Sequence, residues 1–292
     1  MKKKRLIILR VALVCLLGLL IGWQAISQED NGAEATKQQN PSQFAPVDFW
    51  SGLEDDELPS YCQQNFRAGI TSHHQLASSL IGRFFRCLGQ GSNVKTFIVI
   101  GPNHFQQGSR GVLTGQNDWQ TPFGNLSVNQ EIIGELRQSD LIEVNDQAVA
   151  PDHAISYLTP YIKHFFPKAQ IVPLLLRFDF SESEAKSLVK LLAETIDNET
   201  FILGSVDFSH YLNLDQANEN DLISRDIIEN FKLAEVYQHS DGFFDTAPGL
   251  FTILSLLAGQ GIEQVHLLNH SNSFAFNNQP VNTTSYFSWL FN

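Results

Sequence analysis

The sequence lacks the short motifs that identify the commoner classes of enzyme. It contains no GxGxxG or Walker pattern, so no phosphate-binding loop is expected. It contains no CxxC, HExxH or GxSxG, which removes support for zinc ribbons, zincins and α/β-hydrolases. Repeats and low-complexity tracts are absent, and only one of the 292 residues is Met. The chemistry of this chain must therefore be sought in individual side chains of a globular domain.

Basic residues are scarce outside the first ten positions. Those positions hold five of the 19 Lys and Arg, which leaves 14 basic residues against 31 acidic ones in the rest of the chain. Affinity for nucleic acid comes mainly from Lys and Arg that neutralise phosphates. Nucleic acid is therefore not expected as a partner, and a small molecule or a peptide is favoured.

The N-terminus has the composition of a targeting segment. Residues 1–27 combine four consecutive cations with an apolar run, which predicts a signal peptide or a membrane anchor. Residues 28–46 hold almost no large apolar side chains and are expected to be a flexible linker to a domain over residues 47–292. The segment predicts contact with the cell membrane, with the domain outside the cytoplasm, or secretion. In such a compartment Cys62 and Cys87 would either form a disulfide or remain two buried thiols.

Short apolar runs alternate with longer amphipathic segments, which is typical of the α/β class with a central sheet flanked by helices. The predicted strands are Arg67–Thr71, Thr96–Ile100, Gln170–Leu176, Thr200–Ser205, Gln264–Asn269 and Thr283–Leu290. The predicted helices are His74–Leu88, Asn129–Ser139, Ala154–Phe166, Glu182–Ile196, Asp215–Phe231 and Pro248–Ala258. Ser181 begins a Ser-Glu-Ser-Glu pattern that predicts a capping box. A single α/β domain of about 245 residues follows.

Three histidines follow predicted strands closely: His73, His104 and His210. Ligands of open α/β sheets bind beyond the carboxyl ends of strands, so these side chains are candidates for a common site. Two imidazoles and one carboxylate form a well-known iron site with open positions. Spacing does not choose the carboxylate among the available acids, which are Asp152, Asp179, Asp207 and Asp245.

Two Asp–His pairs are candidates for acid–base chemistry. Asp207 and His210 lie three residues apart after a strand, where the acid would orient the imidazole, or where Asp207 would only cap the turn. Asp152 directly precedes a predicted helix and has an equally good explanation as its N-cap. Its neighbour His153 is the more informative member of that pair.

The ordered segments RAGITSHHQLAS, FIVIGPNHF, NDWQTPFGNLSVN, DHAISYLTPYI and FILGSVDFSHY resemble the Memo-like family, also called AmmeMemoRadiSam system protein B. The resemblance runs from about Arg67 to Leu254. It implies a fold similar to the LigB-type class III extradiol dioxygenases and the binding of iron or copper.

The resemblance also implies a set of metal ligands. The family's first two histidine ligands fall on His73 and His104, and its third ligand, a cysteine, falls on Asp245. A carboxylate in place of a thiolate favours iron(II), manganese or zinc over copper(I). The alternative is that Asp245 merely caps the helix that follows it. Three further motif positions of the family fall on His153, Asp207 and His210, which would either support the metal ligands or act as acids and bases.

The leading hypothesis is therefore a divergent Memo-like protein with a divalent metal, iron(II) before zinc, manganese or copper. Oxygen-dependent or redox chemistry on a small molecule follows by analogy with the dioxygenases. A non-catalytic module that binds a peptide or small ligand in the same crevice is the competing class. A hydrolase that activates water on the metal is a third alternative.

Overall fold

The computed structural model describes residues 38–51, 53, 57–239 and 242–292. Its strands are β1 (Gln39–Pro41), β2 (Ala68–Thr71), β3 (Thr96–Pro102), β4 (Val112–Thr114), β5 (Asp118–Thr121), β6 (Gly124–Val128), β7 (Ile142–Val144), β8 (Gln170–Leu176), β9 (Thr200–Ser205), β10 (Phe208–Leu212), β11 (Val265–Asn272) and β12 (Thr283–Phe291). Its α-helices are α2 (Pro46–Ser51), α3 (Ser78–Gly91), α4 (Gln130–Leu136), α5 (Asp146–Val149), α6 (His153–Ser156), α7 (Thr159–Phe165), α8 (Glu182–Ala193), α9 (Leu214–Glu229), α10 (Leu233–Val236), α11 (Ala247–Gly259) and α12 (Ser273–Asn277).

One mixed sheet joins the described strands in the order β1-β5-β6-β8-β3-β9-β2-β12-β10, with β11 paired to β12 and β4 paired to β7 and β8. Its centre, β8-β3-β9-β2, is parallel throughout. Every residue of β2, β3 and β9 is buried. Parallel strands are covered on both faces and read as continuous apolar runs, which explains why these strands are predictable from sequence.

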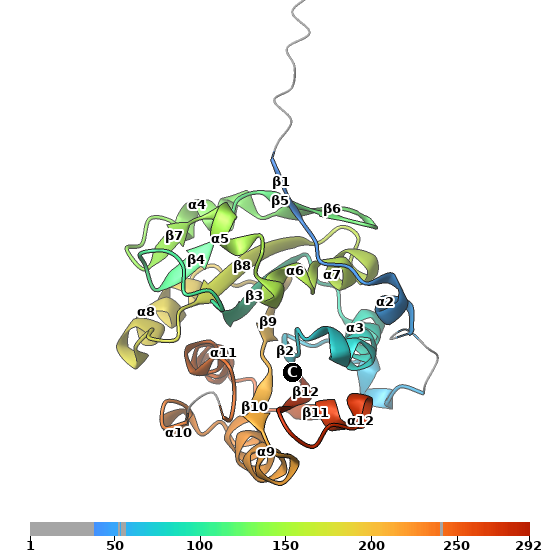
Figure 1. Cartoon of the computed structure of the whole chain (residues 1–292). Helices are drawn as coiled ribbons and strands as arrows, with labels where there is room; N and C mark the ends of the chain where they lie inside the picture. The colour runs from blue at the N-terminus through green and yellow to red at the C-terminus, as the bar shows by residue number, and fades with distance from the viewer. Residues whose placement is uncertain (1–37, 52, 54–56, 240–241) are drawn as a thin grey trace, which may run out of the picture. The chain divides into compact units, whose positions relative to one another are not determined.

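Helices cover the two faces of this central sheet. In Figure 1, α3 and α7 lie on one side and α8 and α11 on the other. Helix α3 turns an apolar stripe that includes Ile81, Phe84 and Phe85 inward, and it contacts β2 and β12. Helix α11 is buried along most of its length and contacts β3 and β9. The predicted α/β class, a single domain with a central sheet flanked by helices, is confirmed.

The elements expected from the sequence are present, most with shifted ends, except that the helix predicted over Ala154–Phe166 is two short helices, α6 and α7. The six predicted strands correspond to β2, β3, β8, β9, β11 and β12. The capping box at Ser181 is formed, with its side chain and that of Glu184 each accepting from the other's backbone N–H. Short strands at the sheet margin were not predicted. One of them, Gln39–Pro41, falls inside the segment expected to be a linker and pairs in parallel with β5.

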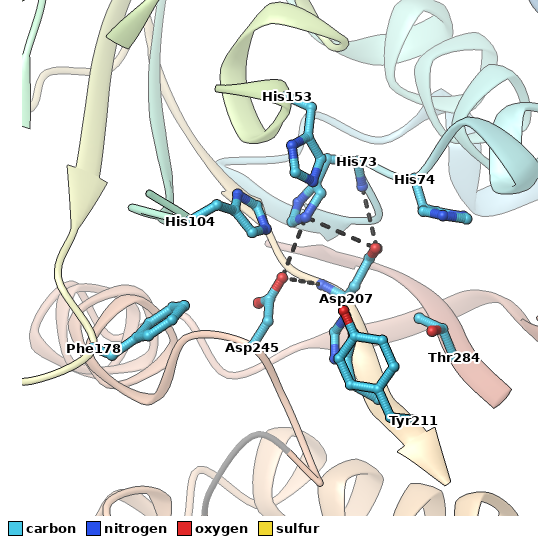
Figure 2. Close-up of a pocket in the computed structure, with 10 residues that line it drawn as sticks. His73, His74, His104, His153, Phe178, Asp207, Tyr211, Asp245 and Thr284 are labelled. Carbon is cyan, nitrogen blue, oxygen red and sulfur yellow. Dashed lines mark hydrogen bonds and ion pairs between the residues drawn. The ribbon is translucent and has the colours of Figure 1, made fainter. Parts of the chain in front are cut away.

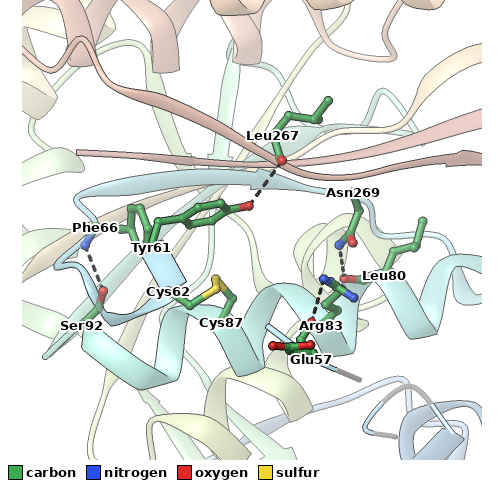
Figure 3. The surroundings of a disulfide bond; sticks show 10 residues. All are labelled: Glu57, Tyr61, Cys62, Phe66, Leu80, Arg83, Cys87, Ser92, Leu267 and Asn269. Atoms are coloured by element: carbon green, nitrogen blue, oxygen red, sulfur yellow. Dashed lines mark hydrogen bonds between the residues drawn. A yellow bond between two sulfur atoms is a disulfide. The ribbon is translucent and has the colours of Figure 1, made fainter. Parts of the chain in front are cut away.

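Cys62 and Cys87 form a disulfide, which answers the question that the sequence leaves open. The bond joins the short 3-10 helix Ser60–Gln63 to α3, and both cysteines are fully buried (Figure 3). Nearby, the backbone N–H of Phe66 donates to Ser92 Oγ at 3.0 Å. The segment that leads into β2, and therefore toward His73, is thus fixed against α3 by a covalent and a polar contact.

The prediction of a membrane partner, and of a membrane or secreted location, is corrected. Across the described part of the chain, no helix is both long and apolar enough to cross a bilayer. Residues 1–27, on which the prediction depended, lie outside the described residues. The membrane and export predictions are therefore not carried further.

Candidate metal centre

The carboxyl ends of β2, β3 and β9 meet at one edge of the sheet and open into a cavity of about 430 Å³. Figure 2 shows the side chains that point into it. They come from segments far apart in the sequence, and they are His73, His74, His104, His153, Phe178, Asp207, His210, Tyr211, Asp245 and Thr284. All six side chains predicted for the site therefore lie in one cavity, although their individual roles stay predictions.

His104 is held by the turn that follows β3 and by a buried acid. Asn103 closes this turn, because its amide donates to the carbonyl of Gln107 at 2.8 Å and accepts from the backbone of Gln107 at 3.2 Å. Asp152, which is fully buried, accepts from His104 Nδ1 at 2.8 Å and from the His104 backbone N–H at 3.0 Å. With Nδ1 donating to a carboxylate, Nε2 of His104 is left with a lone pair, as in many metal-bound histidines.

Asp152 has a second role that the sequence predicted. It is the N-cap of α6 and accepts from the backbone N–H of Ala154 at 3.0 Å. Helix α6 approaches β3 so closely that a Cβ at Gly101 would lie 2.9 Å from the Cβ of Ala154. Glycine at this position thus lets α6 deliver Asp152 and His153 to the edge of the sheet.

His73 is oriented by a hydrogen-bond chain from β9. Ser205 Oγ donates to the carbonyl of Ala154 at 2.6 Å, so its oxygen is available to accept from His73 Nδ1 at 2.9 Å. This fixes the proton of His73 on Nδ1 and turns Nε2 toward the cavity. His73 and His104 therefore share one arrangement, in which Nδ1 is anchored and Nε2 faces inward.

His153 completes a cluster of three imidazoles. One ring nitrogen from each of His73, His104 and His153 lies within 4.8 Å of the others, a grouping that could hold a metal ion. The rings of His104 and His153 are stacked with centroids 3.9 Å apart. Burial, together with the nearby His73 and His104, lowers the pKa of His153 to about 4. At neutral pH this ring is uncharged and its lone pair is available.

Two buried carboxylates lie on the other side of His73. Asp245 Oδ2 is 3.2 Å from His73 Nε2 and also accepts from the backbone N–H of Asp207 at 3.2 Å. Asp245 Oδ1 is buried and has no hydrogen-bond partner. The helix cap is not Asp245 but Thr246, whose side chain accepts from Gly249 at 3.0 Å. The alternative in which Asp245 merely caps the following helix is thereby excluded.

The charge on His73 depends on these acids. Burial alone would lower its pKa, but the carboxylates of Asp207, Asp245 and Asp152 overcome that effect and raise the pKa to about 9. Asp207 is itself fixed, since it accepts from Ser72 Oγ and from the backbone N–H of His73. Burial opposes its ionisation, yet His73 and His210 hold its pKa below the usual range. In the absence of a cation, the proton on His73 thus balances the buried negative charge.

His210 enters the cavity from a distorted strand. Its neighbours Ser209 and Tyr211 have φ angles of 46° and 57°, in the left-handed region that non-glycine residues rarely adopt. The pairing of β10 with β12 shifts register at this point. His210 Nδ1 is buried without a hydrogen-bond partner. Backbone strain of this kind clusters at functional sites, and here it turns His210 inward. Asp207 hydrogen-bonds Ser72 and the His73 backbone instead of orienting His210 as the sequence suggested.

Some side chains that line the cavity were not predicted as site residues, and one acid considered as a ligand lies outside it. Phe178 and Tyr211 could not be predicted, because single aromatic residues, one in a turn and one in β10, are ordinary. His74 shares a hydrogen bond at Nδ1 with the hydroxyl of Tyr286, 2.9 Å away. Asp179 forms an ion pair with Arg177 outside the cavity, so it is not a ligand candidate.

Fold and site together define an α/β protein with a candidate metal centre at the carboxyl edge of a mixed sheet. The family model described as "Memo-like protein" matches residues 58–289. A MEMO1 family protein of Caldivirga maquilingensis is 26% identical over 212 residues, covering 70% of this chain and 74% of that relative. A second, from Thermoplasma volcanium, is 28% identical over 195 residues, covering 63% and 69%.

The chain therefore belongs to the Memo-like protein family. A solved structure of an uncharacterised protein from Escherichia coli K12 aligns with a TM-score of 0.52 at 14% identity, covering 77% of this chain and 99% of that one. At this level of identity the likeness bears on the fold alone.

Proposed function

We propose that this protein binds a divalent metal ion through Nε2 of His73, Nε2 of His104 and the carboxylate of Asp245. Iron(II) is the first choice, with zinc, manganese and copper as alternatives. The observation that carries the proposal is the shared arrangement of the two histidines, whose Nδ1 atoms are anchored to Ser205 and Asp152. Such anchoring is the usual support of metal-bound imidazole.

The donor set fits a hard or borderline divalent cation. Two neutral imidazoles and a carboxylate suit iron(II), manganese and zinc better than copper(I), which prefers sulfur. Asp245 Oδ1, buried without a partner, is a polar atom that a cation would satisfy. A cation would also replace the proton that His73 carries among three acids. The residues present therefore fit the group.

Bound iron(II) would supply redox and oxygen chemistry, and we propose that the protein applies this chemistry to a small molecule. The chain's own contribution is to position and to move protons. His153, uncharged at neutral pH, can accept a hydrogen bond from a ligand in the cavity or serve as a further nitrogen ligand. His210, with Nδ1 unpartnered, is the second imidazole free for this role.

The first test is the metal content of the full chain, purified without a metal-binding tag and reconstituted with iron(II) without oxygen. Near-stoichiometric metal is expected in the unaltered protein. His104→Ala and Asp245→Ala should each lose most of it. His266→Ala is the matched control, because His266 lies outside the cavity and bonds Asn292.

Two results would overturn parts of the proposal. Metal retained in Asp245→Ala but lost in His153→Ala would replace the carboxylate by the third imidazole as ligand. Metal absent from the unaltered protein would reject the metal site. The cavity would then be a binding module in which the histidines act as hydrogen-bond donors.

A further inference from the structure

A second, smaller cavity adjoins the candidate metal centre. Its volume is about 200 Å³, and its walls are Phe178, Tyr237, His239, Phe244, Asp245, Ala247 and Pro248. Phe178 and Asp245 also line the larger cavity, so the two spaces share part of one wall. Figure 2 shows these two side chains next to each other on the same side of the larger cavity. One ligand can therefore contact both spaces.

The walls of the second cavity are mostly aromatic and are fixed by the fold. Tyr237 donates its hydroxyl proton to the carbonyl of Phe180 at 3.1 Å, and its ring packs 5.4 Å from that of Phe251. Phe244 is buried and forms a β-bridge with Phe208. A cavity of about 150 Å³ with apolar walls is large enough for a benzene ring. At about 200 Å³, and with Phe178, Tyr237 and Phe244 beside the polar side chains of His239 and Asp245, the second cavity has room for one ring.

Phe178 lies where the two cavities meet. Phe178 is 45% exposed. Its backbone N–H donates to Gln106 Oε1 at 3.2 Å, in the same turn that carries His104. The backbone at Phe178 is therefore tied to the turn that carries a candidate metal ligand. A ligand that covered Phe178 would remove apolar surface from water.

The charge around both cavities restricts the ligand further. Among the described residues that line the two cavities, none is Lys or Arg, and the acidic ones are Asp207 and Asp245. Away from the metal, a phosphate or a free carboxylate on the ligand would find no Lys or Arg to pair with and would approach the carboxylate of Asp245. Nucleotides and phosphorylated metabolites are disfavoured for that reason.

We propose that the second cavity is a ring subsite of the candidate metal centre. Its ligand is a molecule without phosphate or free carboxylate, in which a compact metal-binding head is joined to one aromatic ring. The head occupies the histidine cavity, and the ring lies against Phe178, Tyr237 and Phe244. This inference rests on the proposed metal site and adds the class of molecule that the site accepts.

The test compares two chelators that share a head and differ in a ring. Acetohydroxamate and benzohydroxamate are titrated calorimetrically into the zinc-loaded full chain, because zinc adds no redox reaction. Benzohydroxamate is expected to bind on the order of tenfold more tightly, as apolar groups in a fitted pocket give differences of this size.

Two variants remove the ring subsite in different ways. Ala247→Leu fills the second cavity, and Phe178→Ala deletes the shared aromatic wall. Each should abolish the preference for benzohydroxamate, and acetohydroxamate should bind to Ala247→Leu, which lines only the second cavity, as before. Leu222→Ala is the control, because Leu222 is an exposed apolar residue of α9 outside both cavities, and it should keep the preference.

The outcomes separate the two proposals. Equal affinity for the two hydroxamates in the unaltered protein, or a preference that survives in both variants, would overturn the ring subsite and leave the metal site standing. A chain that binds neither zinc nor either hydroxamate would overturn the proposed metal site, and the subsite with it.

Discussion

In the metal-free protein, the free energy of unfolding is expected to fall as the pH rises from about 6.5 to about 9. The cause is His73, whose pKa is about 9 in the folded chain and 6.5 in the ordinary reference state. A group with a raised folded pKa stabilises the protein fully below its unfolded pKa. That contribution is lost as the pH rises through the folded pKa.

The size of this effect follows from the two pKa values. Each pH unit that separates them is worth about 1.4 kcal/mol, so complete titration of His73 removes roughly 3 kcal/mol. This is a large part of the 5–15 kcal/mol typical of a folded domain. His73 is 1% exposed, so screening by solvent changes the figure little.

His153 produces the opposite slope on the acid side. Its folded pKa is about 4, so it must remain uncharged in the folded chain, and stability falls as the pH drops below 6.5. Burial lowers the pKa of His74 and His164 in the same direction. The metal-free protein is therefore expected to be most stable near pH 6.5.

The assay is urea unfolding in the presence of a chelator, at fixed ionic strength, at intervals from pH 5 to pH 9.5. The loss of stability above pH 6.5 should disappear in His73→Asn and persist in His164→Asn. It should also disappear when zinc is bound, because the metal takes the place of the proton. A constant free energy of unfolding between pH 6.5 and pH 9 in the metal-free protein would refute the reasoning.

Three further predictions follow from single contacts. Asp152→Asn should weaken metal binding 10–100-fold by removing the acceptor of His104, whereas Asp179→Asn should not change it, as metal titration would show. Cys62→Ser should lower the free energy of unfolding by about 3–4 kcal/mol, the loop-closure value for a separation of 25 residues, and chemical denaturation would reveal a smaller loss if the estimate is wrong. Gly101→Ala should cost about 1–3 kcal/mol and weaken metal binding, because its Cβ would displace α6; unchanged melting and metal affinity would contradict this.

The central strands could be predicted because strands that are buried on both faces are continuous apolar runs in the sequence. Thr96–Pro102 is a continuous apolar run that ends in Gly-Pro, and the structure buries every residue of it. Ser181 carries the capping pattern that the structure forms. The strands Val112–Thr114 and Ile142–Val144 were missed because three residues give too little pattern. Their conformation comes from pairing with each other and, for the first, with β8.

The site was partly predictable for a similar reason. Histidines after parallel strands must gather at the carboxyl edge, so the topology places His73 and His104 together. The anchoring of His73 depends on Ser205 and a carbonyl of α6, two contacts between segments distant in sequence. The sequence likewise gave no basis for the distance between Cys62 and Cys87. Contacts of this kind depend on tertiary packing, which spacing along the chain does not encode.

The most direct test of the account is a crystal structure of the iron(II)-loaded protein with anomalous data at the iron edge. The account predicts an anomalous peak in the histidine cavity, roughly 2.1 Å from Nε2 of His73 and of His104, with Asp245 as the carboxylate ligand. Crystals of reconstituted protein without a peak in this cavity, or with iron bound only elsewhere, would contradict it.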